Sequence, residues 1–134
     1  MKKEFSKFWV RSTQPRKQRK YRYNAPMHIR QKLVSAHLDK KLRDEYKKRS
    51  ISLRKGDEVM VMRGEFRKKT GTVARIDLKR LKIFVDGIKK KKVSGQEVDA
   101  ALEPSNVKII KLNLDDKMRK KILLRKEAKK EVKK

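Results

Sequence analysis

Residues 61–76, VMRGEFRKKTGTVARI, combine two glycines, a cluster of cations and threonines, which are residue types that bind phosphate. Two kinds of site use them: a nucleotide-binding P-loop, or a β-hairpin that presents basic side chains to a larger polyanion. A P-loop needs the spacing G-x-x-x-x-G-K-[ST] at the start of a helix, so that backbone N–H groups and one lysine surround a phosphate. Here Lys69 stands where the second glycine belongs, and Gly71 is followed by Thr72 and a β-rich segment. The spacing therefore favours the hairpin.

The remaining reactive side chains do not form a catalytic pattern. The chain has no cysteine, which excludes disulfides, thiol nucleophiles and thiolate metal sites. Its two histidines, His28 and His37, therefore have no cysteine partners for a zinc site. The paired acids Asp115 and Asp116 fit a helix cap better than an acid–base pair. We expect no enzyme activity, no cofactor, no metal and no small-molecule substrate.

The charge balance predicts a polyanionic partner. Lysine and arginine number 43 against 16 acidic residues, which gives a net charge of +27. Self-repulsion at this level disfavours a compact free chain, whereas each cation that meets a phosphate releases a counterion and so drives binding. Nucleic acid and an anionic membrane surface both qualify. No apolar run approaches the ~20 residues of a membrane span, and we expect neither a span nor a signal peptide. The absence of cysteine fits a cytosolic location.

Composition divides the chain into three zones. These are a basic N-terminal extension with short helices (1–50), a zone rich in glycine and β-branched residues (51–112) and a basic C-terminal helix (113–134). Hydrophobic residues make up 36% of the chain, below the roughly 45–50% of an ordinary domain. A core is therefore expected over part of the chain only, in the middle zone.

The N-terminal zone is expected to begin as an extended or disordered arm and to continue as two short helices. Residues up to Asn24 show no sustained hydrophobic periodicity. Asn24 and Pro26 then form a helix start, with the asparagine as cap and the proline in the first turn. A second helix is predicted near Asp39. The apolar residues expected to line these helices are Met27, Ile29, Leu33 and Val34 for the first, and Leu38, Leu42 and Tyr46 for the second.

The middle zone predicts a small closed β-barrel. Its expected strands are 58–63, 72–78, 82–87, 98–102 and 107–112. Glycine-containing turns join them, and closure into a barrel removes exposed edges. Structural turn roles are assigned to Gly56, Gly64 and Gly71, the last of which either needs an unusual backbone conformation or lets another backbone approach closely. The side chains expected to point inward are Val59, Val61, Ile83 and Val85.

The C-terminal zone predicts a helix that starts near residue 115. Asp115 or Asp116 can cap its first turn, and lysines crowd the far end, where the helix dipole favours cations. Met118 and Ile122 are expected on one apolar face, with Leu123 beside it.

Basic side chains interleaved with aromatic and amide groups are the candidate RNA contacts. Cations bind phosphate, amides can bond to 2′-OH groups or base edges, and tyrosine can stack on bases. The candidates are Arg11, Gln14, Arg16, Lys17, Gln18, Arg19, Lys20, Tyr21, Arg22, Tyr23, Asn24, His28, Arg30, Arg63, Phe66, Arg67, Lys68 and Lys69. Three alternatives stay open. The arm can be a disordered tail without defined contacts, Phe66 can pack the loop instead of stacking on a base, and the basic run 89–92 can be a solvated face of a hairpin or a phosphate contact.

At these residues a resemblance to a known family becomes visible. Residues 53–87, LRKGDEVMVMRGEFRKKTGTVARIDLKRLKIFVDG, resemble a KOW motif, the short β-hairpin module of ribosomal and transcription-elongation proteins. The basic RKQRK segment at 16–20, NAPMHIR at 24–30 and KMRKKILLRK at 117–126 sharpen the match. Together they are similar to the KOW-containing large-subunit ribosomal protein that is twenty-fourth in the universal series, in its archaeal and eukaryotic form. The departures include Glu103 before Pro104, where the family commonly has histidine, and His37, where proline is frequent.

The resemblance implies a mainly β fold with helical extensions: a small SH3-like barrel, a basic N-terminal arm with helices, and a C-terminal helix. It also implies a structural constituent of the large ribosomal subunit, located in the cytoplasm as part of the ribosome. Relatives of this kind bind and stabilise the 5′ region of the large rRNA, act early in assembly and lie near the polypeptide exit tunnel. The implied partners are large-subunit rRNA and neighbouring ribosomal proteins.

Three rival functions are weaker. A KOW protein of transcription elongation, or a free RNA chaperone, usually carries the module beside other domains, whereas here the resemblance covers nearly the whole chain. A membrane-active protein would use the C-terminal amphipathic helix, but that helix has a narrow apolar face and no aromatic residue. An enzyme would need a constellation of reactive groups that the sequence does not contain.

Overall fold

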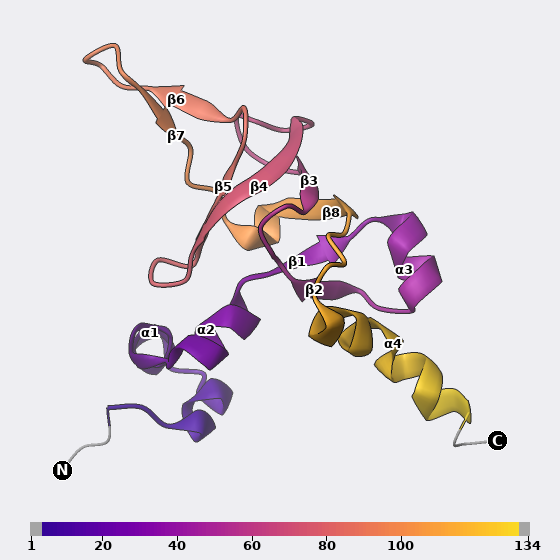
Figure 1. The fold of residues 1–134 in the computed structure, drawn as a ribbon. Helices are drawn as coiled ribbons and strands as arrows, with labels where there is room; N and C mark the ends of the chain where they lie inside the picture. Colours follow the sequence, from indigo (N-terminus) through magenta and orange to yellow (C-terminus); the bar gives the residue numbers. More distant parts are fainter. Residues whose placement is uncertain (1–3, 132–134) are drawn as a thin grey trace.

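Four of the five predicted strands lie next to one another in a six-stranded sheet, in a computed structural model that describes residues 4–131 (Figure 1). In spatial order the strands are β2 (Ser50–Ser52), β1 (Ser35–Leu38), β8 (Val107–Lys111), β3 (Glu58–Val61), β4 (Thr70–Asp77) and β5 (Lys82–Val85). Strands β1 and β8 run parallel, and the other neighbours are antiparallel.

The core lies on the inner face of this bent sheet. The four side chains predicted to point inward, Val59, Val61, Ile83 and Val85, are all buried, as strand alternation requires. A register shift between Val73 and Arg75 bends β4, and an isolated bridge joins Ile83 to Leu102. The sheet thereby curls into a small barrel-like domain, which confirms the expected β-barrel with helical extensions.

Strands β1 and β2 were not predicted. In β1, Ala36 and Leu38 are buried and alternate with half-buried Ser35 and His37. This pattern is too short to separate from the helical spacing that assigned Val34 and Leu38 to helices. Pairing of β1 with β8 makes these residues a strand, because a buried position in a sheet outweighs the local spacing of apolar residues. The sheet therefore begins before residue 50, within the zone predicted as an extension.

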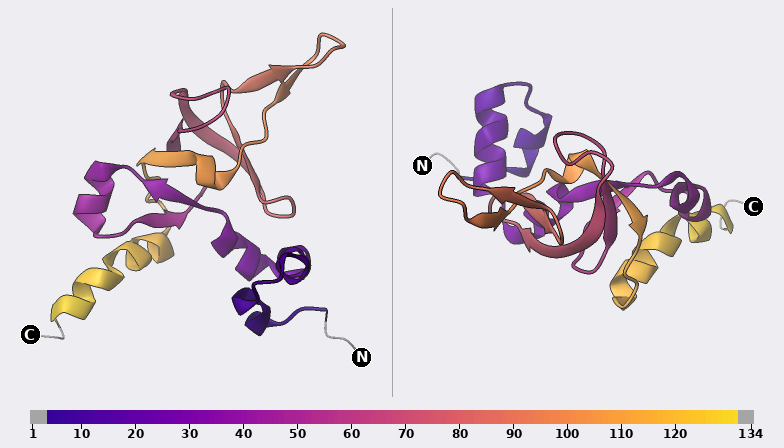
Figure 2. Two further views of the ribbon diagram at one scale, coloured as in Figure 1. Left: turned by 180° about the vertical axis from the view of Figure 1, so that it is seen from behind. Right: turned by 90° about the horizontal axis from the view of Figure 1, so that it is seen from above.

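A two-stranded hairpin projects from the barrel (Figures 1 and 2). It consists of β6 (Lys89–Lys91) and β7 (Glu97–Asp99). Ile88 and Ala100 are buried at its base, whereas β6 is exposed along its length. The predicted strand 98–102 is thus only partly right, because its first residues belong to this hairpin and Leu102 returns to the barrel. A short 3-10 turn, η2 (Pro104–Asn106), precedes β8.

The N-terminal arm is helical, which corrects the expectation of an extended or disordered segment. It contains η1 (Lys7–Arg11) and α1 (Pro15–Asn24). Pro15 occupies the first turn of α1, where its missing N–H costs no hydrogen bond, and the straight-chain arginines and lysines that follow have good helix propensity. The helix escaped prediction because a polar surface helix shows no hydrophobic period. Asn24 ends α1, and it is not the predicted cap of the next helix.

Three further helices frame the barrel. Helix α2 (Met27–Leu33) and helix α3 (Lys40–Tyr46) confirm the two predicted in the N-terminal zone, and Asp39 stands at the N-cap position of α3. Helix α4 (Lys117–Glu131) confirms the C-terminal one, and Asp116 caps it, since its Oδ1 accepts a hydrogen bond of 2.8 Å from the backbone N–H of Met118. In the described part of the chain, no helix is both long and apolar enough to cross a membrane.

The buried face of α4 differs from the predicted one. Met118 and Ile122 remain exposed to solvent, whereas Arg119 and Leu123 are buried. Leu123 joins the barrel core. The face of α4 that packs on the barrel is therefore shifted by one residue from the expected apolar face. It includes the charged side chain of Arg119.

An ion pair between Asp39 and Lys108 ties the start of α3 to β8, with Nζ and Oδ1 2.7 Å apart. The hydrogen bond from Lys108, together with its charge, lowers the pKa of Asp39 below the ordinary carboxyl value despite an opposing effect of burial. A carboxyl group whose pKa is lowered on folding stabilises the fold above its unfolded pKa, and it loses this effect as pH falls through the folded pKa.

We therefore expect Asp39→Asn to lower the melting temperature at neutral pH and to approach the parent at about pH 2. Thermal melts across this range measure the effect. Asp44→Asn, an exposed change on the same helix, is the control and should follow the parent throughout. A difference for Asp39→Asn that stays constant with pH would contradict the ion-pair explanation.

Candidate nucleic-acid interface

One amide organises the N-terminal arm. Nε2 of Gln18, on α1, donates hydrogen bonds to the carbonyl oxygens of Trp9 (3.0 Å), Val10 (3.3 Å) and Ser12 (2.7 Å). Lys20 Nζ lies 5.2 Å from the centroid of the Trp9 ring. These contacts hold η1 against α1, so Gln18 has a structural task rather than the RNA contact predicted for it.

Two further predicted RNA contacts serve the arm itself. The ring of Tyr21 is 7% exposed and stacks on Phe5, with centroids 5.3 Å apart. Because a buried ring cannot receive a base, Tyr21 is corrected from a stacking platform to a packing residue. Nδ2 of Asn24 donates to the carbonyl oxygen of Glu4 at 2.6 Å, which pins the segment before η1 onto the end of α1.

Arg30 fixes the angle between α1 and α2. Its Nε donates to the carbonyl oxygen of Ala25 at 2.7 Å, and its Nη2 donates to that of Tyr23. These carbonyls lie at the end of α1, where helical partners are missing, and a guanidinium satisfies both. Arg30 therefore fixes the angle between α1 and α2, and its contact with phosphate remains a prediction.

The other arm candidates lie on the surface. Tyr23 is 79% exposed, so its ring is available for stacking. The exposed residues are Arg11, Gln14, Arg16, Lys17, Arg19, Lys20, Arg22, Tyr23 and His28. The structure thus presents them on the folded η1–α1 unit, except for His28, which lies on α2, and their contact with RNA remains a prediction.

A second basic surface surrounds the loop between β3 and β4. The exposed cations here are Arg63, Arg67, Lys68 and Lys69. Phe66 is 7% exposed and belongs to the core cluster, with Lys69 Nζ 5.1 Å from its ring centroid and Lys90 Nζ at 5.8 Å. Of its two predicted roles, packing of the loop is therefore the one the structure supports.

The projecting hairpin adjoins this loop, which sequence reasoning missed. Lys90 Nζ lies 3.3 Å from Glu65 Oε2 as well as over the Phe66 ring. The exposed lysines Lys89, Lys91 and Lys92 therefore extend the loop surface. The basic run was recognised in the sequence, but only folding shows that it neighbours a loop more than twenty residues earlier.

The three turn glycines are required for two different structural reasons. A Cβ on Gly71 would lie 2.6 Å from the carbonyl oxygen of Asp86 and 2.7 Å from Val85 Cγ1, so Gly71 is needed for close approach of β5 and not for an unusual backbone conformation. Gly56 and Gly64 instead have positive φ values of 86° and 90°, which side chains resist.

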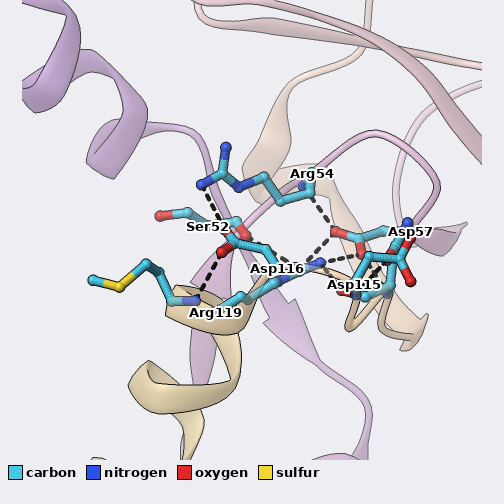
Figure 3. A network of polar contacts seen from close by, with 8 residues as sticks. Ser52, Arg54, Asp57, Asp115, Asp116 and Arg119 are labelled. Carbon is cyan, nitrogen blue, oxygen red and sulfur yellow. Dashed lines mark hydrogen bonds and ion pairs between the residues drawn. The ribbon is translucent and has the colours of Figure 1, made fainter.

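Asp57 and Arg119 form a buried ion pair that fastens α4 to the barrel (Figure 3). The carboxylate is 0% exposed and Arg119 is 3% exposed. Nη1 donates to Oδ1 at 2.6 Å and Nη2 to Oδ2 at 2.7 Å, a bidentate geometry. The backbone N–H groups of Arg54 and Asn113 also donate to the carboxylate.

Arg119 in turn donates to the carbonyl oxygens of Asn113 (2.7 Å) and Ser52 (3.3 Å). This network joins β2, the turn before β3 and α4. With every carboxylate oxygen occupied, Asp57 is unsuited to acid–base chemistry. Nor do the described residues contain any group of three or more His, Cys, Asp or Glu side chains that could hold a metal ion.

Comparison with known proteins identifies the family of the chain that carries these two basic surfaces. The family model for the eukaryotic ribosomal proteins L26 and their archaeal L24 counterparts matches residues 12–126. The chain belongs to this family. The match includes α1, the barrel and most of α4, and it begins just after η1.

Two curated relatives support the match to the ribosomal family. The "Large ribosomal subunit protein uL24" of Methanothrix thermoacetophila is 52% identical over 114 residues, which cover 85% of this chain and 98% of the relative. The protein of the same name from Korarchaeum cryptofilum is 49% identical over 120 residues, which cover 90% and 92% of the two chains. Membership of this ribosomal family makes the chain a structural protein of the ribosome in the cytoplasm, and not an enzyme.

Proposed function

We propose that this ribosomal protein binds and stabilises large-subunit rRNA through two basic surfaces. One is formed by the exposed cations of the N-terminal arm, and the other by those of the β3–β4 loop and the β6–β7 hairpin. The observation that carries the proposal is the set of exposed cations on α1 and on the β3–β4 loop. Among the described residues, no ion pair uses Arg16, Arg19, Arg63 or Arg67. Cations without acidic neighbours, on a chain of net charge +27, are free to neutralise phosphates.

The finer role we infer is binding to the 5′ region of the large rRNA, early in subunit assembly, near the polypeptide exit tunnel. The resemblance of the KOW segment and its flanks to ribosomal proteins motivates this inference. The name that both relatives share, a large ribosomal subunit protein, supports the large subunit as the location. Neighbouring ribosomal proteins are the expected protein partners. A small barrel with a folded basic arm suits the role, because the arm can reach between RNA helices while the barrel holds its base.

Recognition would rest mainly on phosphates and shape. Each neutralised phosphate lowers the logarithm of affinity by ~0.7–0.9 per logarithm of salt, so many contacts give a steep salt dependence. The exposed Tyr23 and Gln14 add groups that can stack on a base or bond to its edge.

Sedimentation tests the ribosomal assignment directly. A native lysate is run on sucrose gradients at low salt and at about 0.5 M salt, where non-specific phosphate binding largely collapses, and the chain is followed by immunoblot. We expect it to stay with the large subunit at both concentrations. Release to the top of the gradient at high salt would instead favour a free RNA-binding protein.

Deleting residues 1–23 should weaken rRNA affinity and flatten its salt dependence while the barrel still folds. The reason is that this segment carries much of the exposed charge, whereas the barrel core begins at Val34. Filter binding at several salt concentrations measures the slope, and a thermal melt checks the fold. An unchanged slope would contradict the proposal.

A second variant separates charge from folding of the arm. Glutamine at positions 16, 17, 19 and 22 removes cations but keeps good helix formers. This variant removes four of the nine cations of residues 1–23, so it should flatten the slope by a part of the effect of the deletion. If only the deletion had an effect, the arm would matter for its shape and not for its phosphate contacts.

A further inference from the structure

A cleft of about 760 Å³ is bounded by α2, β4 and the segment before α4. Gln31 of α2 contributes one wall, Ala74 and Arg75 of β4 another, and the segment before α4 a third, at Asn113 and Asp116. Its size falls within the roughly 300–1,000 Å³ of small-ligand sites. Nothing in the family relationship assigns a role to it.

The floor of the cleft is apolar. It is made by Val34, Leu53, Ile76 and Leu78, of which the first two are buried and the others half-buried against the core. Because Val34 and Leu53 are 1% and 3% exposed, the accessible part of the floor belongs to Ile76 and Leu78, and it favours a ligand with an apolar face.

The rim of the cleft carries polar groups without protein partners. Among the described residues, no hydrogen bond or ion pair uses the side chains of Gln31 or Lys55. Arg75 also lines the cleft, but its guanidinium lies 4.2 Å from the centroid of the Phe84 ring, on the face of β4 opposite to Ile76. It therefore adds positive charge near the cleft and not a surface on which a base stacks.

The charges around the cleft leave a positive excess. Arg54 pairs with Asp116 at 3.2 Å (Figure 3), and Arg119 is neutralised by Asp57. Lys55 and Arg75 then stand against Asp115 alone. The ligand that suits this cleft therefore combines an apolar face, hydrogen-bonding edges and a negative charge.

We propose that the cleft binds a single unstacked nucleotide of the rRNA. Its base lies on the apolar floor, the Gln31 amide bonds to the base edge, and Lys55 meets a flanking phosphate. Unstacked bases in loops and bulges are the usual targets of sequence-specific RNA recognition. This inference rests on the proposed rRNA binding, and it adds a position at which the protein reads a base.

Blocking the cleft tests the proposal. Gln31→Trp places a large ring over the cleft from the surface of α2, and Met27→Trp puts the same ring on an exposed position of the same helix, outside the cleft. Both full-length variants are bound to large-subunit rRNA, and base reactivity is measured by chemical probing. We expect Gln31→Trp to return one nucleotide, protected by the parent and by Met27→Trp, to its reactivity in free RNA, while the rest of the footprint persists.

A second pair tests the charge. Lys55→Gln should release the same nucleotide, whereas Arg80→Gln, which removes an exposed arginine outside the cleft, should not. If Gln31→Trp left every nucleotide protected, the proposal would be overturned. It would also be overturned if the blocked variant kept its RNA footprint but lost a neighbouring ribosomal protein from assembled subunits. Absence of any footprint for the parent would instead refute the proposed rRNA binding itself.

Discussion

Replacing Arg119 with methionine is expected to lower the free energy of unfolding by about 3–5 kcal/mol. The substitution leaves the Asp57 carboxylate fully buried without its bidentate partner. It also removes the donors to the carbonyl groups of Ser52 and Asn113. Undocking of α4 from the barrel should accompany the loss.

Chemical denaturation measures this effect, with two controls. Arg54→Gln breaks an ion pair in which both side chains are largely exposed to solvent, and it should cost at most about 1 kcal/mol. Combining Arg119→Met with Asp57→Asn removes the uncompensated charge and should recover part of the loss. Equal effects of Arg119→Met and Arg54→Gln would show that the buried pair does not fasten α4.

Gly71→Val is expected to destabilise the barrel by about 3 kcal/mol or more, at the upper end for overpacking. Strand β5 passes so close that even a Cβ would meet the Asp86 carbonyl oxygen at 2.6 Å, and a backbone atom cannot move aside as a side-chain end can. A thermal melt should show a clear drop in melting temperature.

Gly64→Ala is the matched control for Gly71→Val. A Cβ on Gly64 meets nothing within 4 Å, so only its positive φ of 90° opposes the change. We expect a smaller cost of about 1–2 kcal/mol there. A melting temperature for Gly71→Val equal to that of the parent would count against the pairing of β4 with β5.

The strands of the barrel were predictable because their alternation is local. Val59 and Val61, or Ile83 and Val85, lie on one face whatever their partners are. Strand β1 was not predictable, because its conformation depends on partners farther along the chain: Ala36 pairs with Ile51 of β2, and Leu38 with Ile109 of β8. Gly71 was identified as structural from its place at a strand start, and the neighbour that requires it could be seen only in the fold.

The residues of the candidate interface also fall into those that the sequence could predict and those that it could not. Exposure of Arg16 or Arg67 follows from residue type, so these cations were found in the sequence. Gln18, Tyr21, Asn24 and Arg30 were grouped with them because composition cannot tell a side chain that binds its own arm from one that faces outward. Arg119 was missed for a related reason. An arginine on a basic helix gives no signal of burial, except that it lies four residues before buried Leu123.

Pairing of β1 with β8 also sets the order in which parts of the chain can fold. Asp39 and Lys108 are 69 residues apart, whereas the Gln18 amide reaches partners 6 to 9 residues away. Distant pairings form slowly and only after the later segment has been synthesised. We therefore expect the arm to acquire its shape while the chain is still emerging, and the barrel to close last. During synthesis the arm would then be ready to engage RNA before its own scaffold is complete.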